Sequence, residues 1–460
     1  MPSSSQADRI WLANPLAVYT GASQSAEAGV LIQGNQIIEL IAASGSPAAG
    51  YDQKIDLSGK VLLPGLINTH HHFYQTLTRA LPAALNKNLF PWLKTLYPVW
   101  ARLDRESHRA ATRLALAELL LSGCTTASDH HYLFSQDIPD AIDHQFEIAT
   151  EMGVRVVLTR GSMSLGEEQG GLPPQSVVQT EEAILDDSER LIKQYHQTDF
   201  GAMQQIALAP CSPFSVTEGL MREAAQLARA KGVLLHTHLA ETLDEEKFCI
   251  ERTGKRPLDY AEALGWIGDD VWFAHGVHFN PDEIRRLGET RTGIAHCPVS
   301  NMRLASGIAP IPALVDAGAR VGIAVDGSAS NDSGNLLREA QATLFVHRLR
   351  GGAGAMGATR ALRIATRGGA EVLGRDDVGS IVRGQRADLA LYRLDDVGFA
   401  GARHDPVAAL LFCCGQMRAD TVVVDGKVVV DGGRLVTADV DEIAREGDRH
   451  SRALLGHCAE

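Results

Sequence analysis

The residues with the clearest chemical potential are histidines that follow short apolar runs. Seventeen histidines occur among the 460 residues, and residues 64 to 72 read PGLINTHHH. In an extended strand the side chains of residues i and i+2 point the same way, so His70 and His72 can reach one cation while His71 points away. This spacing predicts two ligands of a metal site.

A second histidine pair and two acidic residues extend this candidate site. Residues 235 to 241 read LHTHLAE, in which the same parity places His236 and His238 on one side of a strand. His238 is the better candidate ligand because it ends the run, and Glu241 three residues later is free to move protons. Asp326 ends the apolar run in IAVDG, where a buried carboxylate needs a metal ion or a cationic partner.

Three neutral imidazoles and one carboxylate form a ligand set that suits Zn²⁺, with Fe²⁺ as the alternative. One divalent metal ion is therefore the expected cofactor. Such an ion lowers the pKa of a bound water toward 7 and produces a nucleophile at neutral pH. Hydrolysis is the chemistry that these residues predict.

The elements that must position these side chains are visible as short apolar runs. From about residue 61 such runs alternate with longer amphipathic stretches, which is typical of buried parallel strands with crossover helices. The eight expected strands are Val61–Asn68, Thr125–Asp129, Val154–Thr159, Ile206–Pro210, Val233–His238, Val271–His275, Gly293–His296 and Val321–Asp326. Eight such strands predict an α/β fold, a (β/α)8 TIM barrel, whose active site lies at the C-terminal ends of the strands.

The two ends of the chain have a different pattern, with short β-like runs and turn dipeptides. Gly34-Asn35 interrupts an apolar run near the N-terminus, and Asp425-Gly426 separates two valine runs near the C-terminus. We therefore expect a small β-sandwich domain built from residues 1–60 and 371–460, the latter ending in a helical tail. The barrel occupies residues 61–370 between them.

These motifs together resemble the amidohydrolase superfamily, in its mononuclear aminohydrolase branch. The resemblance spans nearly the whole chain and rests on PGLINTHxH, HxxE at 238–241, Ala274-His275 and Val325-Asp326-Gly327. It implies a metal site of His70, His72, His238 and Asp326. It further implies that Glu241 shuttles protons, that His275 orients or polarises the attacking water, and that Asp326 takes the proton of that water.

The number of metal ions bears on the reaction. Binuclear members of the superfamily use a carbamylated lysine at the end of strand four, but the corresponding residues here read IALAPC and contain no lysine. One metal ion is therefore expected. This favours deamination of a heterocycle over cleavage of a cyclic amide, which would usually require a second metal.

Each candidate substrate-binding residue has a structural alternative. Gln75 could read the edge of a purine or triazine ring, or it could cap a helix. Arg160 could bind a carbonyl oxygen of the ring, or form a salt bridge at the barrel rim. Cys211 could face the ring, or be an inert packing thiol. The aromatic stretch 86–100 could cap a flat ring, or serve helix packing.

The segments around Cys211 and the histidine triplet are most similar to 8-oxoguanine deaminases and to hydroxydechloroatrazine ethylaminohydrolases. The resemblance implies a small heterocyclic substrate, with conversion of 8-oxoguanine to urate and ammonia as the expected reaction. An s-triazine aminohydrolase and a guanine deaminase are the alternatives. A cyclic amide hydrolase and a non-catalytic scaffold also stay open.

Composition restricts the class of partner. The chain is 45% hydrophobic and 22% charged, which is typical of a globular protein, and its net charge of −13 disfavours nucleic acid. The N-terminus lacks the pattern of a signal peptide, and no apolar stretch reaches the ~18 residues of a membrane span. We expect a cytoplasmic protein whose seven cysteines, including the adjacent Cys413 and Cys414, are reduced thiols. By analogy with the family, we expect a homo-oligomer.

Overall fold

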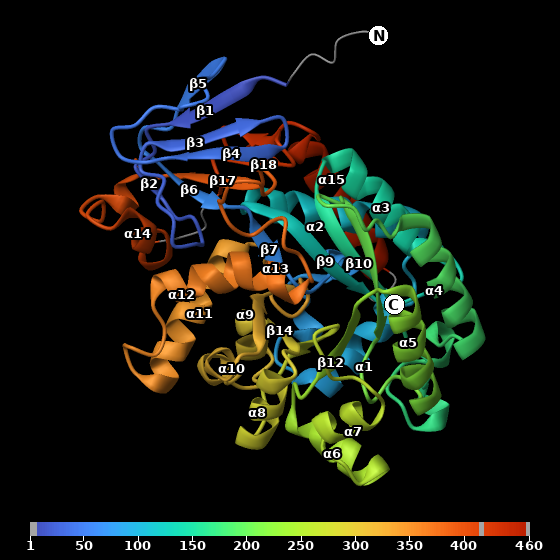
Figure 1. Cartoon of the computed structure of the whole chain (residues 1–460). Coiled ribbons are helices and arrows are strands. Elements are labelled where there is room, and N and C mark those ends of the chain that lie inside the picture. The colour runs from blue at the N-terminus through green and yellow to red at the C-terminus, as the bar shows by residue number, and fades with distance from the viewer. Residues whose placement is uncertain (1–6, 414–417, 457–460) are drawn as a thin grey trace.

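The predicted barrel is confirmed by the computed structural model, which describes residues 7–413 and 418–456 (Figure 1). Eight parallel strands close in the order β10-β11-β12-β13-β14-β15-β7-β9. In chain order they are β7 (Leu66–Asn68), β9 (Cys124–His131), β10 (Arg155–Ser162), β11 (Gln204–Pro210), β12 (Leu235–Leu239), β13 (Val271–His275), β14 (Gly293–His296) and β15 (Arg320–Ile323). Each overlaps one of the expected apolar runs.

The first expected strand is divided in the structure. β6 (Lys60–Pro64) pairs with a strand of the small β domain, and only β7 enters the barrel. Gly65 lies between them, where a Cβ would come 2.1 Å from Thr125 Oγ1, so a larger residue would push the chain away from β9. The single strand Val61–Asn68 is therefore a wrong prediction, and the domain boundary at residue 60 stays a prediction.

Helices surround the barrel, and several of them begin at side-chain caps that the sequence supplies. Asp104, Thr180, Thr217 and Asn280 each accept a backbone N–H in the first turn of the helix that follows. The helices between residues 89 and 303 are α1 (Leu89–Trp100), α2 (Arg105–Leu121), α3 (Ala141–Met152), α4 (Glu181–Tyr195), α5 (Glu218–Lys231), α6 (Leu243–Thr253), α7 (Pro257–Ala263), α8 (Pro281–Glu289) and α9 (Pro298–Arg303).

The remaining helices complete the barrel wall and the C-terminal tail. They are α10 (Ile311–Ala317), α11 (Leu336–Gly351), α12 (Ala358–Arg363), α13 (Gly369–Val372), α14 (Pro406–Phe412) and α15 (Val440–Gly456). The tail helix α15 packs against α2 on the outside of the barrel. None of the described helices combines the length and the apolarity that crossing a bilayer requires.

Two sheets from the ends of the chain pack on each other beside the barrel (Figure 1). One has the order β4-β3-β1-β5 and the other β2-β6-β17-β18-β19-β20. Their remaining strands are β1 (Arg9–Ala13), β2 (Ala17–Val18), β3 (Gly29–Gln33), β4 (Gln36–Ile41), β5 (Gln53–Asp56), β17 (Leu389–Arg393), β18 (Thr421–Val424), β19 (Lys427–Asp431) and β20 (Arg434–Leu435). Leu12 and Ile32 of the first sheet share a core with Leu62 and Leu389 of the second, as expected for a sandwich.

The two predicted hairpin turns meet each other in this sandwich. Gly34 lies between β3 and β4 at φ 58°, while Asp425 and Gly426 join β18 to β19 at φ 48° and 79°. A Cβ at Gly426 would come 2.2 Å from the Gly34 carbonyl oxygen, so the close contact requires glycine. The N- and C-terminal β segments are thus joined at their turns as well as in their core.

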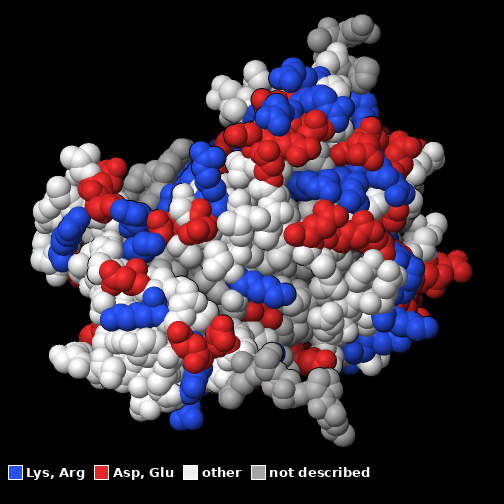
Figure 2. All heavy atoms as spheres, turned by 90° about the horizontal axis from the view of Figure 1, so that it is seen from above, with Lys and Arg blue, Asp and Glu red and all other residues white. Residues whose placement is uncertain are grey.

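The described cysteines and one charged face of the surface can be compared with the expectations from composition. Cys124, Cys211, Cys249, Cys297 and Cys413 are free thiols, whereas Cys414 and Cys458 lie outside the described residues. On the face seen in Figure 2, basic and acidic side chains alternate in patches of both signs. That face presents no continuous basic area.

Candidate active site

The strand ends bring the first predicted residues together. After β7 the chain passes through His70 into β8 (His71–His72), which pairs in parallel with β16 (Asp326–Gly327). The Asp326 backbone N–H donates to the His70 carbonyl oxygen at 3.2 Å. The Nε2 atoms of His70 and His72 lie 3.2 and 3.3 Å from Asp326 Oδ1. His71 points elsewhere, against Phe73, as the parity of the strand predicted.

Hydrogen bonds on the far side of each imidazole fix which nitrogen faces the centre. His72 Nδ1 and His238 Nδ1 each lie 2.7 Å from a backbone carbonyl oxygen, so each Nδ1 carries the proton and donates it. His236 Nδ1 likewise donates to a carbonyl oxygen at 2.9 Å, which leaves its Nε2 to accept from His70 Nδ1 at 2.7 Å. All three candidate ligands therefore turn an Nε2 lone pair toward the centre.

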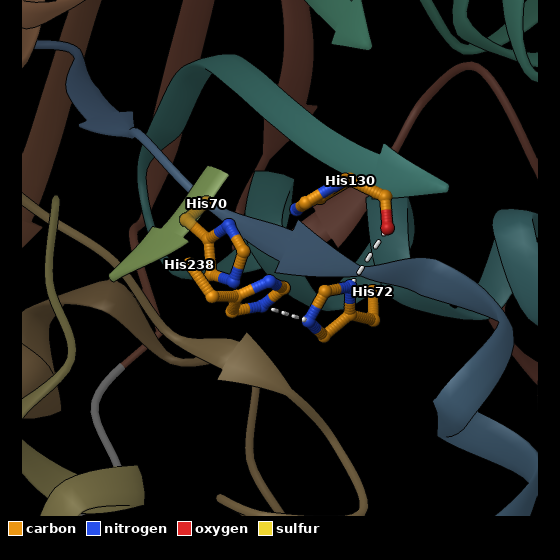
Figure 3. A group of neighbouring side chains, drawn as sticks. All are labelled: His70, His72, His130 and His238. Carbon is orange, nitrogen blue, oxygen red and sulfur yellow. Dashed lines mark hydrogen bonds between the residues drawn. The ribbon is translucent and has the colours of Figure 1, made fainter. Parts of the chain in front are cut away.

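These atoms have the proximity that a metal site needs. Potential ligand atoms of His70, His72, His130 and His238 lie within 4.8 Å of one another, and so do those of His70, His238, His275 and Asp326. Figure 3 shows the first group, with His72 joined to His130 and to His238. The predicted set takes members from both groups, and its buried nitrogen and oxygen donors fit a divalent ion.

Two hydroxyl groups hold the Asp326 carboxylate in place beside the histidines. Its Oδ2 accepts from Ser300 Oγ at 2.5 Å and from Ser330 Oγ at 2.9 Å, which leaves Oδ1 facing the histidines. Burial alone would raise the pKa of Asp326, but the close polar contacts of this carboxylate with the imidazoles of His70 and His72 outweigh burial and hold the pKa well below the usual value. Asp326 is therefore an ionised carboxylate at neutral pH.

Glu241 and His275 lie on the other side of the centre. His275 Nε2 lies 3.5 Å from Glu241 Oε2, and Ser306 Oγ donates to Glu241 Oε1 at 3.2 Å. Burial raises the pKa of Glu241, so this carboxyl is able to hold a proton. For His275, burial lowers the pKa, but the charges of Glu241 and Asp326 outweigh it and the net direction is upward.

Backbone strain is concentrated around the same centre. Ala240, His275 and Asp326 are all non-glycine residues with positive φ, at 55°, 72° and 61°. Each follows or ends a barrel strand, at the point where the chain turns over the mouth. Such conformations persist only where the surrounding contacts enforce them, and they are frequent at functional sites.

A cavity opens from this centre toward α1 and contains most of the predicted residues. Its lining comprises His72, Gln75, Leu89, Trp92, Leu93, Tyr97, Tyr132, Cys211, Phe214, His238, Glu241, His275, Leu304, Asp326 and Ser330. The aromatic stretch 86–100 contains α1, and its aromatic residues divide between lining the cavity and packing against the barrel. Trp92 and Tyr97 line the cavity, whereas Trp100 packs against Tyr74 with ring centroids 5.3 Å apart.

Gln75 and Cys211 face this cavity. Gln75 lies in the short 3-10 helix Phe73–Thr78, and its buried Oε1 has no hydrogen-bond partner, so it can accept a hydrogen bond from a bound ring. A Cβ at Gly327 would lie 1.9 Å from that oxygen, which shows how closely the backbone packs on it. Burial raises the pKa of the Cys211 thiol to about 12, so the thiol is neutral and unreactive.

Arg160 does not line the cavity, and we correct its expected role. Its side chain donates to Asp187 Oδ2 at 2.6 Å and to Gln179 Oε1 at 3.0 Å, so it forms the rim salt bridge that was the alternative. The physical reason is strand parity: Arg160 is in register with His131 on the neighbouring strand, while Thr159 is in register with His130. His130 faces the barrel interior, so His131 and Arg160 face the helices.

Several residues of the site were not selected from the sequence. His236 fixes the tautomer of His70, and His130 adds a further imidazole whose Nδ1 has no partner. His130 lies near the end of β9 and His236 lies two residues before His238 in β12, so both are visible in the sequence as neighbours of the site. Tyr97 and Tyr132 line the cavity and come from α1 and from the loop after β9, where no short sequence motif marks them.

Comparison with known proteins identifies the family. A sequence model of the amidohydrolase family matches residues 61–429. The chain belongs to the amidohydrolase family. It is 57% identical over 425 residues to an 8-oxoguanine deaminase of Pseudomonas aeruginosa, covering 92% of this chain and 94% of that protein. It is 37% identical over 407 residues to a hydroxydechloroatrazine ethylaminohydrolase of Pseudomonas sp. (strain ADP), covering 87% and 84%.

Solved structures of this family have the same architecture. The atrazine chlorohydrolase TrzN from Arthrobacter aurescens TC1, complexed with zinc, is 34% identical with a TM-score of 0.89, covering 96% of this chain and 100% of that one. The predicted amidohydrolase resemblance is therefore confirmed. The curated relatives are named deaminases and aminohydrolases, which also confirms the predicted class, a hydrolase acting on C–N bonds.

Proposed function

We propose that this chain is a zinc-dependent deaminase that converts 8-oxoguanine and water to urate and ammonia. The observation that carries the substrate is the 57% identity to an 8-oxoguanine deaminase over 92% of the chain. The triazine relative shares 37% and an isoxanthopterin deaminase from an unknown prokaryotic organism shares 36%. In this reaction a C–O bond from water forms at the ring carbon that carries the amine, and the C–N bond to that amine breaks to release ammonia.

The chemistry of the cavity supports a neutral flat ring. Among the described residues that line it, none is a lysine or arginine, so the cavity offers no basic side chain to a phosphate. Trp92 and Tyr97 supply aromatic surface for a ring, and Gln75 Oε1 supplies an unpaired acceptor for a ring N–H. A free purine base fits these walls better than a nucleotide does.

His70, His72, His238 and Asp326 are the residues that would hold the zinc ion. Their inward lone pairs and the ionised Oδ1 of Asp326 are the donors that zinc takes, and the zinc-complexed structural relative supports this choice of metal. Zinc bound here supplies a water activated for attack near neutral pH. Fe²⁺ stays the alternative.

The two buried carboxyl groups have environments suited to different tasks. Asp326 is kept ionised and is therefore the group to accept the proton that the attacking water loses. Glu241 is able to hold a proton, which it would deliver to the ring nitrogen beside the reacting carbon. The proton held by Asp326 would then go to the departing amine, and the proton of the added hydroxyl group would return to Glu241 as ammonia leaves. His275 lies beside Glu241, where its ring can stabilise the charge that develops.

The decisive experiment is ammonia release across a panel of substrates. We would compare kcat/KM for 8-oxoguanine, guanine, isoxanthopterin, cytosine, adenosine and hydroxy-triazines. The proposal expects 8-oxoguanine to have the highest value. A higher kcat/KM for a hydroxy-triazine or for guanine would show that 8-oxoguanine is not the preferred substrate. Absence of ammonia release from every compound would contradict the proposed deamination.

The other expected properties remain predictions. Metal stoichiometry near two would support the cyclic amide hydrolase, and loss of metal binding would support a non-catalytic scaffold. We also retain the homo-oligomer, the cytoplasmic location and the absence of a nucleic-acid partner as predictions that await direct measurement.

A further inference from the structure

A buried glutamate outside the predicted site makes two hydrogen bonds to the chain that carries Glu241. Glu245 is fully buried in the first turn of α6. Its Oε1 accepts from the Ala240 backbone N–H and its Oε2 from the Glu241 backbone N–H, both at 2.8 Å. The two oxygens of one carboxylate therefore fix two successive peptide groups.

This arrangement differs from the usual helix cap. Thr242 is the N-cap of α6 and accepts from Glu245 N at 3.3 Å, which places Glu245 at the position where a capping-box glutamate bonds back to the N-cap N–H. Glu283 of α8 makes that usual bond, to Asn280 N at 2.7 Å. Glu245 instead reaches past its N-cap to the two residues before it.

The turn that Glu245 holds is strained and connects two parts of the site. Ala240 has φ 55°, which is costly for a residue with a Cβ and needs contacts to enforce it. Its carbonyl oxygen accepts from Val277 N at 2.8 Å and from His278 N at 2.9 Å, two and three residues after His275. The Ala240 peptide thus couples the segment that carries Glu241 to the segment that carries His275.

We propose that Glu245 is a positioning residue for Glu241, and this rests on the proposed role of Glu241 as proton carrier. The Glu241 carboxyl accepts one hydrogen bond, from Ser306 Oγ at 3.2 Å, and lies 3.5 Å from His275 Nε2, so its placement also depends on the backbone from which it extends. The Glu245 carboxylate holds that backbone in its left-handed turn. Release of the turn moves the Glu241 carboxyl away from the reacting ring without touching a metal ligand.

The test is a mutant cycle with a matched control. Glu245→Gln keeps the length of the side chain but replaces one acceptor oxygen by a donor, so one of the two bonds is lost. A displacement of about 1 Å in a catalytic group costs on the order of 10²-fold in rate, so we expect kcat to fall about tenfold to a hundredfold, with unchanged metal content and KM within about threefold. Glu245→Asp, one methylene shorter, provides the same test if the glutamine variant does not fold.

The cycle separates positioning from a general loss of structure. In a Glu241→Gln background, Glu245→Gln should lower kcat by less than about threefold further, because the group it positions is already disabled. The control Glu283→Gln removes a buried carboxylate at the same helix position, one that accepts from Asn280 N and pairs with Arg256 but makes no bond to the Glu241 segment, and it should change kcat by less than about twofold. Equal losses in both backgrounds, or equal losses for Glu245→Gln and Glu283→Gln, would overturn the proposal.

A readout without turnover distinguishes this proposal from the proposed function. Hydrogen–deuterium exchange in residues 239–243 should quicken in Glu245→Gln and stay unchanged in Glu283→Gln, because only the first variant frees one of the two backbone amides that Glu245 holds. If the wild type released no ammonia, the proposed function would fail while this measurement still tested the turn. Unchanged exchange in Glu245→Gln would contradict the positioning role.

Discussion

Gly327→Ala is the substitution whose effect on the substrate cavity is most directly fixed by the structure. A Cβ at this position would lie 1.9 Å from Gln75 Oε1 and 2.4 Å from Gln75 Cδ, where ordinary contact begins near 3.4 Å. Gly327 has no positive φ, so the methyl group acts through space and not through backbone strain. The Gln75 amide must therefore move by about 1.5 Å to restore ordinary contact.

The magnitude follows from that displacement. A shift of about 1 Å in a positioning group costs on the order of 10²-fold, which corresponds to about 2.7 kcal/mol of transition-state stabilisation. We expect Gly327→Ala to lower kcat/KM for 8-oxoguanine by about tenfold to a hundredfold. The assay is ammonia release at low substrate, together with metal analysis, because Gly327 directly follows Asp326.

A second background isolates the cause. Gln75→Ala alone should lower kcat/KM about fivefold to tenfold, the value of one hydrogen bond to a neutral group. This is less than the cost of Gly327→Ala, because no displaced amide is left to obstruct the bound ring. Adding Gly327→Ala to Gln75→Ala should then cost less than about threefold, since the side chain that clashes is absent. If Gly327→Ala cost the same in both backgrounds, or if it reduced metal content, the reasoning through Gln75 would be refuted.

Three further predictions concern the metal, the rim and the acid range. His238→Ala should reduce the bound zinc measured by mass spectrometry. Glu241→Gln should retain the metal, and its kcat should fall by about 10²-fold to 10⁴-fold. A fully active Glu241→Gln variant would contradict the role of Glu241 as proton carrier. Arg160→Gln should lower the free energy of unfolding in urea by about 2 kcal/mol and leave KM within about twofold, and a large rise in KM would restore its substrate role. Burial raises the pKa of Asp377, but hydrogen bonds from Arg375 outweigh burial and lower the pKa below its usual value. The contribution of ionised Asp377 to the stability of the folded protein is therefore complete above about pH 4 and is lost as the pH falls further. Asp377→Asn should therefore flatten the acid dependence of the urea midpoint, and an unchanged slope would contradict this.

The barrel could be predicted because each strand is a short apolar run that is buried on both faces. Such runs stand out without knowledge of their partners, as the match of Val271–His275 to β13 shows. The division of the first run at Gly65 could not be predicted, since it depends on contact with Thr125, sixty residues away. A local pattern indicates an extended segment but not which sheet it joins.

The metal-site geometry could be predicted as far as strand parity reaches. Parity separates His70 and His72 from His71 without any knowledge of the register between strands. The direction of Arg160 depends on its alignment with His131, and that alignment exists only in the folded barrel. The hydrogen bonds of Glu245 to the Ala240 and Glu241 amides could not be predicted either. A threonine followed three residues later by a glutamate resembles an ordinary helix start.

The central claim is that one zinc ion is held by His70, His72, His238 and Asp326. The most direct test is anomalous diffraction at the zinc edge from crystals of the full chain, combined with the metal content per chain. The account predicts one peak within bonding distance of the three Nε2 atoms and of Asp326 Oδ1, and about one zinc per chain. Two adjacent peaks, or a single peak away from these four side chains, would contradict it.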